Sequence, residues 1–105
     1  MVMEEYNKIV RDNIPTIIEN NGSKCEIEIV SNEEALSYLY MKLIEEVNEF
    51  LESKDIYEIA DVIEVLYAIC DKMKISRTTL ERARQQKENK NGGFENNIIL
   101  KKVYK

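Results

Sequence analysis

The sequence predicts an all-α domain organised around a helical hairpin, and three observations lead to this prediction. Apolar residues recur at helical spacing from about Glu33 to Leu51. From Ile56 to Met73 the chain is apolar around most of a helical circumference. Between these segments, residues 52–55 form a polar break with the length of a short connection between antiparallel helices. The pattern therefore predicts two long helices packed side by side.

A short helix is predicted before the hairpin. Asp12 or Asn13 can cap it, and proline is tolerated in a first helical turn, so we expect a helix from Pro15 to Asn20. The sequence Asn20-Asn21-Gly22 should end it, because glycine readily takes the backbone conformation that follows a helix.

The segment leading into the first long helix has two signals. Cys25 to Val30 alternates apolar and acidic residues, which is a weak strand pattern. Ser31 or Asn32 can then cap the long helix, with Glu34 as the return partner of a capping box.

The helix from Ile56 to Met73 should be buried among several neighbours, because it is apolar on nearly every side. One partner helix in a chain this short cannot cover it. We therefore expect a homodimer or higher homo-oligomer, in which hairpins form a four-helix type of bundle. Its single polar sector contains Glu58, Asp61, Glu64, Asp71 and Lys72.

A third sizeable helix, basic in character, is predicted after the hairpin. Ser76 should cap it, it should run from about Arg77 to Lys90, and Asn91-Gly92-Gly93 should end it. Ile98 to Leu100 could add a short strand that pairs with Cys25 to Val30, so the all-α class allows a small strand pair from the terminal segments.

Length and composition exclude several classes of protein. The 105 residues predict a single domain over 1–105. The sequence has no apolar run of membrane-spanning length and no secretory leader, so we expect no membrane partner and a cytoplasmic location. Histidine does not occur, which excludes the usual zinc and histidine-assisted nucleophile sites and leaves oxygen ligands for any metal.

Charge is distributed unevenly along the chain. From Glu26 to Asp71 there are 13 acidic and two basic residues, whereas from Lys72 to Lys105 there are three acidic and 10 basic ones. This distribution does not fit a nucleic-acid-binding protein, which needs a strongly basic face. It does fit a protein that holds a metal ion at one place and phosphate groups at another.

Two blocks of paired carboxylates flank the predicted turn. In an antiparallel hairpin folded about residues 52–55, Glu46 lies level with Asp61 and Glu49 lies level with Glu58. Four carboxylates converging from two helices suit a hard divalent cation.

Two plainer interpretations of these acids are a solvated helix face and a capping box formed by Asp55 and Glu58. We favour a metal site, because Glu58, Asp61 and Glu64 belong to the only polar sector of a helix that should be buried, and unpaired buried carboxylates are costly. Lys42 is the main nearby cation that could neutralise them.

The acidic blocks carry a resemblance to a known family. The motifs Glu45-Glu46-Val47-Asn48-Glu49 and Glu58-Ile59-Ala60-Asp61-Val62 resemble those of the MazG-like nucleotide pyrophosphohydrolases, an all-α group that includes phosphoribosyl-ATP pyrophosphatase-like proteins. The segments from Tyr6 to Pro15 and from Asn91 to Glu95 look like the ends of one branch of that group.

The resemblance implies a magnesium site, with Mn²⁺ as a substitute, whose ligands are Glu46, Glu49, Glu58 and Asp61. It also implies that Glu45 handles metal or water, although the helical wheel places Glu45 away from the others; a neighbouring subunit could resolve that conflict. Either Glu45 or Glu49 could orient the attacking water. The basic residues that we expect to contact substrate phosphates are Lys8, Arg11, Lys42, Arg84 and Lys87.

The activity implied by the resemblance is magnesium-dependent hydrolysis of a nucleoside triphosphate between the α and β phosphates, giving monophosphate and pyrophosphate. A house-cleaning role against non-standard or surplus nucleotides would fit. One alternative is a phosphoribosyl-ATP-type pyrophosphatase, which differs in substrate alone. Another is a non-catalytic helical dimer that binds nucleotide or a protein.

Overall fold

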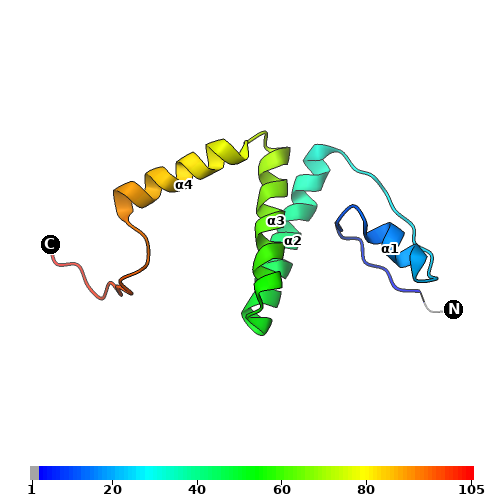
Figure 1. Cartoon of the computed structure of the whole chain (residues 1–105), viewed down its shortest axis with the longest axis horizontal. Helices are drawn as coiled ribbons and strands as arrows, with labels where there is room; N and C mark the ends of the chain where they lie inside the picture. The colour runs from blue at the N-terminus through cyan, green and yellow to red at the C-terminus, as the bar shows by residue number, and fades with distance from the viewer. Residues whose placement is uncertain (1–2) are drawn as a thin grey trace. The chain divides into compact units, whose positions relative to one another are not determined.

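The computed structural model describes residues 3–105, and the regular structure in this part of the chain is four α-helices with no β-strand. The all-α class is therefore confirmed. None of these helices has the length and apolar character needed to cross a lipid bilayer. The chain divides into two compact units, Met1–Ile75 and Ser76–Lys105, and each is described by itself. The helices are α1 (Ile14–Asn20), α2 (Asn32–Ser53), α3 (Ile56–Lys72) and α4 (Arg77–Asn91) (Figure 1).

The connection between α2 and α3 is two residues long and makes the hairpin. Lys54 takes a left-handed backbone conformation, with φ of 56°, and its N–H donates to the carbonyl of Phe50, which ends α2. Asp55 follows directly, and its carboxylate accepts a hydrogen bond of 2.8 Å from the N–H of Tyr57, which starts α3. The predicted hairpin is confirmed, with α2 and α3 side by side (Figure 1).

Serine side chains cap the other two long-helix starts. The Ser31 Oγ accepts from the N–H of Glu34 at 3.1 Å at the start of α2. The Ser76 Oγ accepts from the N–H of Thr79 at 3.1 Å at the start of α4. Each bond satisfies a backbone donor that the helix itself leaves unpaired.

The core of the first unit lies between α2 and α3. Leu39 from α2 packs with Val65 and Ile69 from α3, and these are buried. Ile9 reaches this core from the N-terminal segment, so residues outside the hairpin are anchored beside it. The other partly buried residues that complete this core are Leu36, Leu43 and Ala68.

The expected strand pair from the terminal segments is wrong. Residues 25–30 and 98–100 form no strand, although both segments are among the described residues. Ile27 and Ile29 are 65% and 91% exposed, so the alternation of side chains does not correspond to one buried face. An extended segment becomes a strand only with a ladder of hydrogen bonds, and an isolated strand pair is marginal in water.

Replacing the Ser31 cap should destabilise the hairpin. We expect Ser31→Ala to lower the free energy of unfolding by about 1 kcal/mol, because the N–H of Glu34 loses its acceptor. Ser37→Ala is the matched control, since Ser37 is exposed inside α2 and alanine favours helix there. Urea unfolding followed by circular dichroism measures both, and an equal effect of the two changes would contradict this account of the cap.

Candidate functional site

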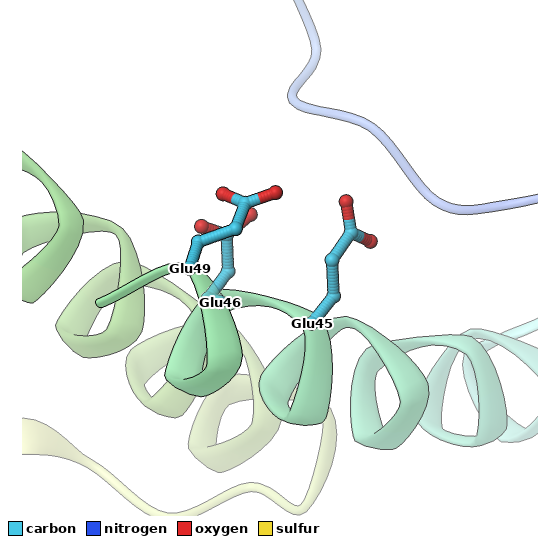
Figure 2. Close-up of side chains that lie close together, drawn as sticks. All are labelled: Glu45, Glu46 and Glu49. Carbon is cyan, nitrogen blue, oxygen red and sulfur yellow. The ribbon is translucent and has the colours of Figure 1, made fainter. Parts of the chain in front are cut away.

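Five carboxylates gather along one side of the α2–α3 hairpin. One oxygen each from Glu46, Glu58 and Asp61 lie within 4.8 Å of one another, and we call this set, which joins α2 to α3, the bridging triad. One oxygen each from Glu45, Glu46 and Glu49 meet the same limit, and we call this set the α2 triad. Glu46 belongs to both triads. Figure 2 shows that the side chains of the α2 triad leave the helix in the same direction.

The hairpin register explains why the bridging triad forms. Glu58 and Asp61 are three residues apart on α3, and so share one helix face. Glu46 of α2 lies opposite them because the chain reverses at Lys54 and Asp55. The four carboxylates singled out from the sequence are thus brought together, since Glu49 shares the α2 triad with Glu46.

The capping-box interpretation of Glu58 does not describe the structure. In a capping box the Glu58 side chain would accept a hydrogen bond from the N–H of Asp55. That N–H instead donates to the Oγ of Ser53 at 3.2 Å. The Glu58 carboxyl group lies in the bridging triad instead. Glu64, which shares the polar sector in the sequence, is exposed and belongs to neither triad.

Glu45 lies closer to the other acids than the helical wheel indicated. The wheel placed Glu45 away from the others, but its side chain leaves α2 in the same direction as those of Glu46 and Glu49, and one of its oxygens joins the α2 triad (Figure 2). A neighbouring subunit is therefore not required to bring Glu45 to the other acids. Glu45 and Glu49 are four residues apart, a spacing that places two side chains beside each other on a helix.

Three cations from the predicted phosphate-binding set contact the acids. Lys42 Nζ lies 3.2 Å from Glu46 Oε1 and 3.6 Å from Glu45 Oε2. Lys8 Nζ lies 2.9 Å from Glu45 Oε1. Arg11 Nη2 lies 2.6 Å from Asp61 Oδ1. Lys8 thus pairs with Glu45, Arg11 pairs with Asp61, and Lys42 pairs with both Glu45 and Glu46.

Lys8 and Arg11 belong to the N-terminal segment, which we call the N-terminal arm (residues 3–13). Lys8 is 37 residues from its partner in sequence and Arg11 is 50 residues from its own. Ile9 packs on the hairpin core between these two cations, which fixes the arm locally. The sequence placed both cations near a ligand but contained no signal for these partners, because spacing rules apply only within one element.

Burial changes the acidity of two members of the bridging triad. The pKa of Glu46 is raised, mainly because its carboxylate is buried, and Lys42 opposes the shift while Glu49 and Asp61 add to it. The pKa of Glu58 is also raised by burial, then by the negative charges of Asp61 and Glu46. Each ionised carboxylate therefore makes the next one harder to ionise.

Two buried oxygen atoms in the bridging triad lack a partner. Among the described residues, Glu46 Oε2 and Glu58 Oε2 are buried and accept no hydrogen bond. Glu46 as a whole is only 5% exposed. Unpaired buried carboxylate oxygens are costly, and a divalent cation is a partner that would satisfy them. This donor set fits a hard cation such as Mg²⁺.

Glu45 differs from these two acids. Its Oε1 pairs with Lys8 and its Oε2 with Lys42, so both oxygens already have a cation. The hydrogen bond from Lys8 is the main reason that the pKa of Glu45 is lowered. Glu45 is therefore held as an ionised acceptor between two lysines.

The remaining two predicted phosphate ligands lie on α4, in the second unit. Arg84 donates to Glu81 Oε1 at 2.7 Å and to Glu88 Oε2 at 2.6 Å. These bonds raise the pKa of Arg84 and give its charge partners within its own helix. Lys87 is exposed on the same helix.

The raised pKa values predict a pH dependence in the presence of a metal chelator. A carboxyl group with a raised folded-state pKa is easier to ionise in the unfolded chain. Stability should therefore fall as the pH rises from about 4.5, the ordinary value, through the raised values. Glu46→Gln cannot ionise, so its stability relative to that of wild type should increase as the pH rises through this range.

Thermal unfolding in EDTA across this pH range measures the difference. Glu64→Gln is the control, because Glu64 is exposed on α3 and outside both triads. An advantage of Glu46→Gln that shrinks as the pH rises would contradict the assignment of burial as the cause.

The site is thus a set of carboxylates held between two helices, partly balanced by three cations and with two buried oxygens left over. No protein-family model matches the chain, and no curated protein or solved structure was found to match it.

Proposed function

We propose that this chain is a magnesium-dependent nucleoside triphosphate pyrophosphohydrolase that cleaves the α–β phosphoanhydride. The observation that supports it best is the pair of buried, unpaired oxygens of Glu46 and Glu58 in the bridging triad. A scaffold would be more stable with apolar residues at such positions, so their presence favours a role in binding a cation. The acidic motifs that resemble MazG-like pyrophosphohydrolases give the reaction class.

The metal ligands in this proposal are Glu46, Glu58 and Asp61, with Glu49 beside them. The bound ion, Mg²⁺ or Mn²⁺ in its place, would neutralise phosphate oxygens and make a water molecule more acidic. Arg11 donates to Asp61 Oδ1, which fixes the orientation of that carboxylate and leaves its other oxygen available.

Glu49 is the better candidate for orienting the attacking water and accepting its proton. Its carboxyl group is exposed and adjoins both Glu46 and Glu58, so it can face a substrate. Glu45 is less suited to that role because its pKa is lowered by Lys8 and both its oxygens are paired. Glu45 instead holds Lys8 and Lys42 at the site.

Lys8, Arg11 and Lys42 supply positive charge for the phosphates. The first two are substantially exposed, so a polyphosphate chain can approach their charged ends. A phosphoribosyl-ATP-type substrate would use the same groups, so that alternative differs only in the part of the ligand beyond the phosphates.

We also propose that the protein works as a homodimer or larger homo-oligomer. On α3, Ile59, Ile63 and Leu66 are 42%, 43% and 41% exposed and lie along one helix face. A second exposed row follows the same spacing on α2. Two apolar rows on one hairpin suit a second hairpin as partner. The residues of the α2 row are Tyr40, Ile44, Val47 and Leu51.

Activity can be tested with a panel of canonical and modified nucleoside triphosphates, with magnesium and with EDTA. We expect magnesium-dependent release of pyrophosphate together with nucleoside monophosphate. Glu46→Gln should reduce kcat by about 100-fold or more, because it removes a metal ligand, whereas Glu64→Gln should leave it unchanged. A folded protein that releases no pyrophosphate from any member would favour the non-catalytic binding alternative.

The oligomer can be tested by light scattering after size-exclusion chromatography. Ile63→Glu places a charge in the exposed row of α3 and should shift the protein toward monomer. Glu64→Ala, a neighbouring position outside that row, should leave the molar mass unchanged. A wild-type protein that is already monomeric at micromolar concentration would contradict the proposal.

A further inference from the structure

The two triads overlap at Glu46 and could, by their oxygens alone, hold two divalent cations. Two-metal sites are common in enzymes that cleave phosphate esters and anhydrides. The number of ions therefore bears directly on how this site would work, and the distribution of its own cations decides between one and two.

The α2 triad already contains two ammonium groups. Lys8 lies 2.9 Å from Glu45 Oε1, and Lys42 lies 3.6 Å from Glu45 Oε2. Lys42 also lies 3.2 Å from Glu46 Oε1. The bond from Glu45 is the main reason that the pKa of Lys8 is raised, and the charge of nearby Glu49 adds to it. Every member of this triad is therefore near an ammonium group.

The bridging triad has a different environment. Among the described residues, Arg11 contacts Asp61 Oδ1, and Lys42 contacts this triad through Glu46 Oε1, the member that it shares with the α2 triad. Both of the buried oxygens without a hydrogen-bond partner, Glu46 Oε2 and Glu58 Oε2, belong to it. One of these oxygens belongs to Glu58, which lies on α3 and outside the α2 triad.

The formal charges of the whole cluster also favour one bound metal ion over two. Five carboxylates against Lys8, Arg11 and Lys42 leave a formal charge of −2. One divalent cation balances this charge, whereas a second would leave the cluster positive before any substrate arrives. A second ion would also lie a few ångströms from two ammonium groups, where repulsion is strong.

We infer that the site takes a single divalent cation, in the bridging triad, and that the ammonium groups of Lys8 and Lys42 occupy the place of a second ion in the α2 triad. The inference rests on the proposed metal site. It assigns to two lysines the phosphate-facing charge that a second metal supplies in two-metal enzymes.

Lys8 is the residue whose removal should change the number of bound divalent cations. It comes from the N-terminal arm and pairs with the half-buried Glu45, so its removal leaves the hairpin core intact. Lys42 is part of α2 and pairs with buried Glu46, so its removal would also destabilise the fold. Lys8→Met is therefore the informative change, since methionine keeps an unbranched side chain without the charge.

The experiment is titration of the full-length protein with Mn²⁺ alone, by calorimetry and by electron paramagnetic resonance of the free ion. Wild type should bind one Mn²⁺ per chain. Lys8→Met should bind a second, weaker Mn²⁺, because Glu45 Oε1 is released and the cluster gains one negative charge. Lys8→Arg should restore a count of one, and Lys24→Met, at an exposed lysine in the segment between α1 and α2, should also bind one.

The outcomes separate this inference from the proposed function. Two Mn²⁺ ions per wild-type chain, or one ion in folded Lys8→Met, would overturn the single-ion inference while leaving a metal-dependent enzyme in place. No Mn²⁺ bound by wild type would overturn both the metal site and the inference. Circular dichroism of each variant establishes that its helices are intact.

Discussion

The buried carboxylate of Glu46 is the constraint on which the rest of the site depends. It is the one charged side chain among the described residues that is buried, and it lies between the two helices of the hairpin. A carboxylate there must find partners, and Lys42 satisfies only one of its oxygens. Its other oxygen, Oε2, has no hydrogen-bond partner, and the neighbouring acids and cations surround it.

The N-terminal arm extends this arrangement beyond the hairpin. Lys8 and Arg11 neutralise acids on different helices, and Ile9 between them packs on the apolar core. A single short segment thus combines a hydrophobic anchor with two charge contacts that are partly exposed and individually weak. The anchor keeps the cations near the carboxylates, which lowers the entropy cost of holding two long side chains in place. The N-terminal arm is therefore part of the candidate site.

The fold was predictable from the sequence because its determinants are local. Apolar spacing located α2 and α3, Ser31 and Ser76 marked helix starts, and the short break at Lys54 and Asp55 fixed the register. That register was enough to bring Glu46, Glu58 and Asp61 together. The strand pattern in residues 25–30 failed for the opposite reason, since a strand depends on a partner elsewhere in the chain.

The parts of the site that could not be predicted depend on side-chain reach and on distant contacts. The ion pairs of Glu45 with Lys8 and Lys42 depend on side-chain positions, and a helical wheel does not include these. The pairs made by the N-terminal arm join residues 37 and 50 positions apart.

These contacts also separate the five acids into two kinds. Glu45 is paired with a lysine on both oxygens, whereas Glu46 and Glu58 each have one buried oxygen without a hydrogen-bond partner among the described residues. Similar residues in one motif therefore take different chemical roles, because the cations around them are supplied by different parts of the chain.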